Sequence, residues 1–183
     1  MLIAEQKKSH NIAEYILYMY QVEDMLRACQ FDWEKIKKQV VEPQTPNPSL
    51  LSDAEKWFAT INKEMKNRSL EKKGHIHEVK EIMGEIVYLH TTLLDVVKDK
   101  KYTDLFEAAK ENIEAFRNKS DLGNIHPVEI CFEALYMKLL MRLKKQEITA
   151  ESEQAFDTMR ILLAYLSKAY HQMKSGNMDF LNN

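Results

Sequence analysis

The chain has 183 residues, of which 45% are hydrophobic and 30% charged, and its formal net charge is −2. This length and apolar content predict one globular domain and exclude a disordered chain. The near-neutral charge gives no electrostatic basis for binding nucleic acid or an anionic membrane surface, and no stretch approaches the roughly 20 apolar residues that span a bilayer. Only four glycines and four prolines occur, which favours a few long helices over many strands.

The first predicted helix begins near Ile3 and is apolar on most of its circumference. A helix that is apolar nearly all round is usually buried at the centre of a bundle. It nevertheless carries Glu23, Asp24 and Arg27, which are spaced so that Arg27 can pair with either carboxylate. Because unpaired buried charges are costly, these residues either dock the helix through ion pairs or line a polar pocket in which Arg27 holds an anion.

Turn and cap signals delimit the next two predicted helices. Asp32 is expected to cap the second helix, Trp33–Val41. Three prolines then predict a polar, extended connection over residues 43–51. A Ser-x-x-Glu capping box that starts at Ser52 opens the third helix, which fades through the charged run 63–73.

His90 is the one polar member of an apolar row in the fourth predicted helix, Ile76–Lys98. The simpler interpretation is a neutral core histidine whose ring nitrogens bond a carbonyl and a hydroxyl group. The alternative is a ligand or proton carrier, because histidine titrates near neutral pH and binds metals.

Three further helices complete the predicted fold. Thr103 is expected to cap the fifth helix, and residues 120–124 form a turn. Pro127, at the favoured first position, begins the sixth helix. Thr149 caps the seventh helix, which ends at Gly176. The sequence therefore predicts an all-α fold, an antiparallel bundle of about six or seven helices in a single domain over residues 1–183, with a frayed tail at 177–183.

The sixth predicted helix carries two acidic residues one turn apart, Glu129 and Glu133. Glu129 lies in the first turn, where the helix dipole favours a carboxylate, so capping is its simpler role. Glu133 lies in mid-helix between apolar stripes, which makes it a stronger candidate for a buried polar site.

Six residues on the first, fourth and sixth predicted helices form a candidate polar pocket: Glu23, Asp24, Arg27, His90, Glu129 and Glu133. The Glu-x-x-His motif of ferritin-like di-iron proteins is absent, which leaves a looser single-metal site as a minor alternative. No nucleophile motif and no phosphate-binding glycine loop occurs. We therefore expect no catalytic residues and no cofactor, and we assign no residue as a metal ligand.

The two cysteines, Cys29 and Cys131, lie far apart in the sequence and outside any C-x-x-C motif. This pattern favours buried free thiols in a reducing compartment. The first residues lack the basic start and unbroken apolar run of a signal peptide, so we expect a cytoplasmic protein.

Two segments resemble a known family. The first is AEYILYMYQVEDMLRAC (residues 13–29), which contains E-Y-x-x-Y-M-x-Q-x-E-D-x-x-R, and the second is HPVEICFEALYMKLLMRLKKQEIT (residues 126–149). They are similar to a family of all-helical proteins of about this length from Bacteroidetes, known only as a domain of unknown function. The resemblance covers essentially the whole chain and implies a cytoplasmic bacterial protein. It assigns no catalytic residue.

We expect a non-enzymatic helical bundle that acts through protein–protein association, either with an unknown protein or with a second copy as a homo-oligomer. The apolar, Met- and Tyr-rich faces of the first, sixth and seventh predicted helices exceed what one packing seam needs, and Met-rich surfaces adapt to partners. The alternative is a bundle that binds a small molecule or a metal in the polar pocket defined above.

Overall fold

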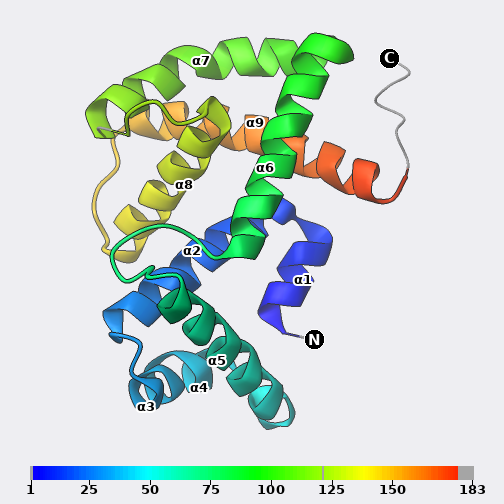
Figure 1. The fold of residues 1–183 in the computed structure, drawn as a ribbon. Coiled ribbons are helices and arrows are strands. Elements are labelled where there is room, and N and C mark those ends of the chain that lie inside the picture. Colours follow the sequence, from blue (N-terminus) through cyan, green and yellow to red (C-terminus); the bar gives the residue numbers. More distant parts are fainter. Residues whose placement is uncertain (1, 121, 177–183) are drawn as a thin grey trace. The chain divides into compact units, whose positions relative to one another are not determined.

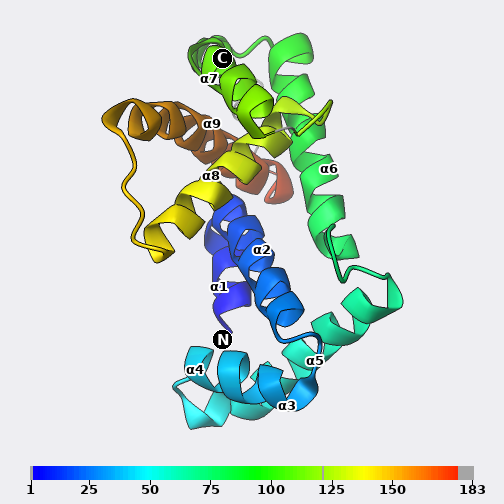
Figure 2. The same cartoon turned by 90° about the vertical axis from the view of Figure 1, so that its left-hand side faces the viewer.

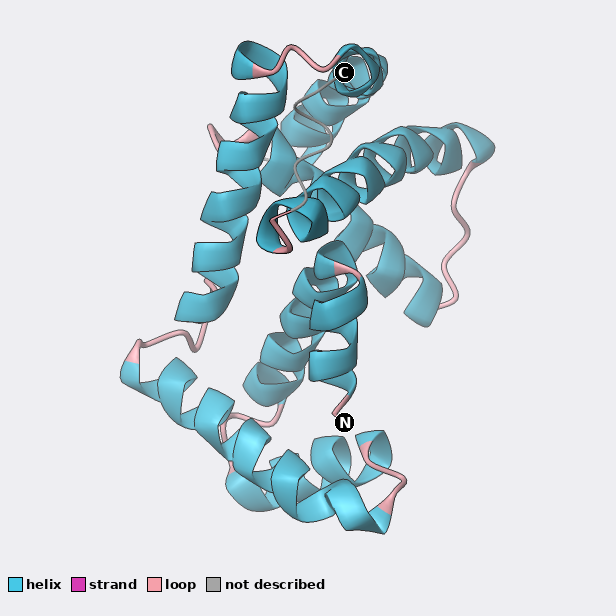
Figure 3. Ribbon diagram, turned by 90° about the vertical axis from the view of Figure 1, so that its right-hand side faces the viewer, coloured by secondary structure: helices cyan, strands magenta, loops and turns pink. Residues whose placement is uncertain are grey.

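The computed structural model describes residues 2–120 and 122–176, and every regular element in these ranges is helical (Figure 1; Figure 3). The all-α prediction is confirmed for this part of the chain. The predicted frayed tail, residues 177–183, lies outside the described residues. The α-helices are α1 (Ile3–His10), α2 (Ile12–Ala28), α3 (Trp33–Ile36), α4 (Glu42–Gln44), α5 (Leu51–Asn67), α6 (His77–Thr91), α7 (Lys100–Ser120), α8 (Pro127–Leu143) and α9 (Ala150–Lys174); η1 (Lys37–Val41) and η3 (Thr92–Val96) are π-helical and η2 (Pro48–Leu50) is a 3₁₀ turn.

The chain divides into two compact units. Unit 1 comprises residues 1–10 and 14–81, and unit 2 comprises residues 11–13 and 82–183. In unit 1, α5 packs against the helical segment that runs from α3 to α4 (Figure 2). In unit 2, α9 packs against both α7 and α8. The antiparallel arrangement of the helices stays a prediction.

The first predicted helix is interrupted at Asn11, which separates α1 from α2. The Asn11 Oδ1 atom accepts hydrogen bonds from the backbone N–H of Ala13 at 3.1 Å and from the Ser167 hydroxyl at 2.8 Å. An asparagine side chain that satisfies a nearby backbone N–H favours a helix start over a helix interior. This local bond explains why α2 begins afresh at Ile12.

Three predicted helix starts are confirmed. The Asp32 carboxylate accepts two backbone N–H groups of the following turn, and α3 begins at the next residue. Helix α8 begins at Pro127. The Thr149 hydroxyl accepts the backbone N–H of Ser152, and α9 follows it. These positions were predictable because a cap acts through residues that are adjacent in the sequence.

The prediction that Pro43 lies outside a helix is wrong, because the helical segment continues through it to Gln44. The π-helical segment η1 closes with the Glu42 N–H bonded to the Lys37 carbonyl, five residues earlier. Pro43 then lies in the first turn of α4, where a missing N–H is tolerated. The irregular part of the predicted connection is correspondingly shorter than 43–51.

The predicted capping box at Ser52 is also wrong. Helix α5 begins one residue earlier, at Leu51, and the residue in the cap position, Leu50, makes no side-chain cap bond. The 3₁₀ turn η2 leads directly into the helix, and its own cap is Asn47, whose side chain accepts the Ser49 N–H at 3.0 Å. The 3₁₀ turn thus starts the helix, which is the role that the sequence predicted for Ser52.

The predicted helix 76–98 is α6 followed by the π-helical segment η3, and α7 starts earlier than predicted. Helix α7 begins at Lys100, so Thr103 is not its cap. The buried Asp99 carboxylate accepts the Tyr102 N–H at 2.9 Å, while the Thr103 hydroxyl donates to the Asp99 carbonyl at 2.8 Å. The sequence did not reveal that Asp99 caps α7, because Asp99 lies among charged residues that are typical of an exposed surface.

Candidate functional site

Glu23 is fully buried in unit 1 and holds two hydrogen-bond donors. Its carboxylate lies 2.6 Å from Nδ1 of His75 and accepts the backbone N–H of Ile76 at 2.8 Å. The His75 ring also stacks on Tyr20, with ring centroids 4.0 Å apart. Glu23 therefore fixes the segment before α6 to α2, which is the docking role that the sequence allowed.

Arg27 also binds the segment that precedes α6. Its guanidinium pairs with Asp24 at 2.8 Å, donates to the Leu70 carbonyl at 3.0 Å, and donates to the Gly74 carbonyl. Of the two pairings expected for Arg27, the structure forms the one with Asp24. Since two carbonyls and a carboxylate engage the guanidinium, these contacts support a docking role, and the anion-holding role stays a prediction.

His90 is buried in unit 2 among aromatic rings. Its Nδ1 lies 2.5 Å from the Tyr102 hydroxyl, and the rings of Phe106 and His126 meet it edge-on at centroid distances of 4.9 and 5.0 Å. Burial, together with the neighbouring His126, lowers the pKa of His90 to about 4. The ring is therefore neutral at pH 7, which fits the interpretation as a core histidine bonded to a hydroxyl group.

Glu129 and Glu133 have different settings on α8. The Glu129 carboxylate accepts the His126 N–H at 3.0 Å, and His126 Nδ1 accepts the Val128 N–H at 3.2 Å, so this end of the helix is a reciprocal cap. Glu129 thus has the capping role expected from its position. Glu133 is half-buried in the middle of α8.

The six candidate residues divide equally between the units. Unit 1 contains Glu23, Asp24 and Arg27, and unit 2 contains His90, Glu129 and Glu133. The pocket expected to unite them stays a prediction. Among residues 2–120 and 122–176, no group of three His, Cys, Asp or Glu side chains is arranged to hold a metal ion.

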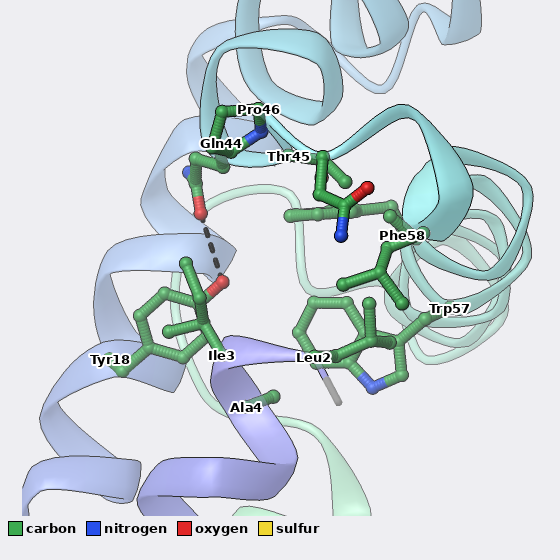
Figure 4. A pocket seen from close by; sticks show the side chains of 12 residues that line it. Leu2, Ile3, Ala4, Tyr18, Gln44, Thr45, Pro46, Trp57 and Phe58 are labelled. Carbon is green, nitrogen blue, oxygen red and sulfur yellow. Dashed lines mark hydrogen bonds between the residues drawn. The ribbon is translucent and has the colours of Figure 1, made fainter.

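A cavity of about 210 Å³ in unit 1 was not predicted from the sequence (Figure 4). It lies between the start of α1, Tyr18 of α2, the connection that follows α4, and one face of α5. Its lining residues are 2–4, 18, 44–47, 50, 54, 57 and 58. None of these side chains carries a charge.

Two polar side chains of the cavity wall, Tyr18 and Gln44, bond to each other. The Tyr18 hydroxyl donates to Oε1 of Gln44 at 2.9 Å, as Figure 4 shows, and the Gln44 amide nitrogen lies 3.2 Å from the Met25 sulfur. Burial raises the pKa of Tyr18 to about 12, so its phenol stays neutral. The wall therefore presents mainly carbon atoms to the cavity.

Aromatic rings form one side of this cavity. Trp57 and Tyr18 lie with ring planes 20° apart and centroids at 6.4 Å, and Phe58 meets Trp57 edge-on at 4.8 Å. The cavity was missed because it depends on where the proline-rich connection packs, and local periodicity does not specify that.

A second feature is an apolar stripe on the outer side of α8, which we call the α8 stripe: Glu133, Met137, Leu140, Met141 and Lys144. At 100° per residue these positions fall within an arc of about 100°. Met137 is 44% exposed, and Leu140 and Met141 are half-buried. On an adjacent face, the Lys138 ammonium is paired with Glu153 at 2.6 Å.

A family profile matches residues 1–177, and its description is "Domain of unknown function (DUF4924)". The chain belongs to this family. The resemblance noted for residues 13–29 and 126–149 is thus confirmed as membership of a domain-of-unknown-function family. No curated protein and no solved structure was found to match this DUF4924 chain. In the part of the chain that the structure describes, no helix is long and apolar enough to cross a membrane.

Proposed function

We propose that this DUF4924 protein is a non-enzymatic association module and that its partner is a second copy of the chain, bound through the α8 stripe. The observation that carries the proposal is the pattern of this stripe. Its exposed and half-buried apolar residues lie between an acidic residue at one end, Glu133, and a basic residue at the other, Lys144.

This charge pattern is self-complementary. In a two-fold symmetric pair the same surface faces itself. When two α8 helices pack antiparallel about the middle of the stripe, Glu133 of each copy lies opposite Lys144 of the other, and Met137 lies opposite Leu140. Apolar contacts then form the centre of the interface and opposite charges form its ends, as in stable helix pairs.

The exposure of Met137 supports the same conclusion. A helix that is apolar almost all round is normally covered on every side, yet α8 leaves Met137 44% exposed. Methionine is flexible and packs well against varied surfaces. Because one helix pair buries a small area, the association is weak and depends on concentration.

Sedimentation velocity over about 1–100 μM, the range expected for a weak interface, tests the proposal. The wild-type protein should shift from monomer to dimer. Met137→Glu should raise the dissociation constant at least about tenfold, because it places a charge at the centre of the interface.

A charge exchange provides the sharper test. Glu133→Lys alone and Lys144→Glu alone should each weaken the dimer, because like charges then face one another. The double variant should restore it. Lys80→Glu, an exposed change of equal charge on α6, should have no effect. A strictly monomeric wild type, or a double variant no better than the single ones, would contradict the proposal.

We also propose a cytoplasmic, bacterial location. Cys29 and Cys131 are both free and buried, as expected for thiols kept in a reducing compartment. Expression of the tagged protein followed by cell fractionation tests this assignment, and recovery from the cell envelope or periplasm would contradict it.

A further inference from the structure

We infer that the cavity in unit 1 binds a compact, neutral, aromatic small molecule. This site is separate from the α8 stripe, so the inference does not depend on self-association. It rests on the volume of the cavity, the chemistry of its wall and its aromatic side.

The volume sets the size of the ligand. The cavity measures about 210 Å³. An engineered apolar cavity of about 150 Å³ in another protein binds benzene. By that comparison the unit 1 cavity takes one ring with a short substituent or two fused rings, roughly eight to ten non-hydrogen atoms. The cavity is smaller than the pockets that bind drug-sized ligands, whose volumes start near about 300 Å³.

The wall sets the charge of the ligand. No charged side chain lines the cavity, and its Tyr18 and Gln44 side chains already bond to each other. An ionic ligand would lose its hydration there without gaining a countercharge. A neutral ligand loses little on entering, because the wall offers mainly apolar atoms.

The aromatic side favours a ring over an aliphatic chain. Tyr18, Trp57 and Phe58 present faces and edges within one small space (Figure 4). Aromatic pairs in offset or edge-to-face geometry gain energy beyond the area that they bury. A planar ring can meet both kinds of surface at once.

The two tryptophans of the chain provide the readout. Trp57 lines the cavity, and Trp33 does not. Titration of the full-length protein with benzyl alcohol should therefore shift the indole N–H signal of Trp57 in a ¹H–¹⁵N spectrum, with saturation, while the Trp33 signal stays in place. For a ligand of this size a dissociation constant of about 1 mM or below is expected. The charged analogues benzylamine and benzoate should bind at least about tenfold more weakly.

Variants that fill the cavity should abolish the shift. Ile3→Phe acts from the rim, where Ile3 is 40% exposed, so it should not disturb the fold. Ala54→Met acts from the buried face of α5. Thr60→Met is an exposed change on the same helix outside the cavity lining and is the matched control, which should bind normally.

Several outcomes would overturn the inference. They are the absence of a saturable Trp57 shift, equal shifts at both tryptophans, equal binding of the charged analogues, and unchanged binding by the Ile3→Phe variant. N-acetylphenylalanine amide carries the same ring on a peptide backbone. If it bound more tightly than benzyl alcohol, the occupant would be a protein side chain and the assignment to a free small molecule would be wrong.

Discussion

Several buried polar side chains in this protein are held by specific partners, and Glu23 shows how much depends on one residue. Its fully buried carboxylate receives both His75 and the backbone N–H of Ile76. A buried carboxylate is stable only where donors replace the water that it has lost. Changes at such positions should therefore cost far more than changes of equal size on the surface.

Glu23→Gln should lower the free energy of unfolding by about 1–3 kcal/mol, because it weakens charge-assisted hydrogen bonds and leaves a buried donor without an acceptor. Urea unfolding at pH 7 measures the loss. Glu14→Gln is the control, since the Glu14 side chain is 57% exposed and pairs with Lys7 at the surface, and it should change stability by less than about 0.5 kcal/mol. Equal effects of the two variants would contradict the assigned role of Glu23.

His90 should make stability depend on pH. Its pKa is about 4 in the folded protein and 6.5 when solvated, so the unfolded chain takes up the proton first as the pH falls. The contribution of neutral His90 is complete above pH 6.5 and is lost between pH 6.5 and about 4. The loss can reach about 3 kcal/mol, at about 1.4 kcal/mol per pKa unit.

His90→Gln removes this titration. Unfolding free energies of wild type and variant, measured from pH 7.5 to pH 4.5, should therefore converge as the pH falls. Parallel curves would show that His90 titrates with the same pKa in the folded and the unfolded chain.

At the scale of helices, local signals in the sequence predicted the starts that one side chain controls, such as Asp32 and Thr149. The errors in predicted helix boundaries arose where an unusual helical geometry, or packing between distant segments, determines where a helix begins or ends. The 3₁₀ turn before α5 replaced the Ser52 cap, and the π-helical segment η1 carried the helix through Pro43. Candidate polar residues were recognised individually, since charges in apolar rows are visible in sequence. Their partners were not, because the packing of the 70–76 segment has no local signature.

The caps give a direct test at this scale. Asp32→Ala should destabilise the protein by about 1 kcal/mol, because its carboxylate accepts two backbone N–H groups. Ser52→Ala should have almost no effect, since that serine is an exposed residue inside α5. Thermal or urea unfolding compares them, and a larger loss for Ser52→Ala would restore the capping box that the sequence suggested.

For the whole molecule, the two free cysteines are probes of the two units. Cys29 lies in unit 1 and Cys131 in unit 2, and both are buried. Burial raises the pKa of both thiols, that of Cys131 to about 12. Since the thiolate is the reactive species, neither should react in the folded state.

Ellman's reagent should therefore label the native protein only slowly at pH 7 and should label two thiols per chain in urea. With Cys29→Ser, the remaining signal reports the opening of unit 2 alone, and with Cys131→Ser it reports unit 1. Rapid labelling of either thiol without denaturant would show that its unit opens readily or that the thiol is accessible.

The π-helical segments have a consequence for how the length of this chain can vary. A π turn holds one more residue than the α turn that it replaces, and the helix on either side keeps its faces. Deleting one residue within η1, which lies between α3 and α4, should therefore keep both on one helical segment, whereas a deletion in the middle of α9 rotates all later residues by about 100°. Circular dichroism and thermal unfolding of the two deletions compare these outcomes. Relatives one residue shorter at η1 can thus share the same packing.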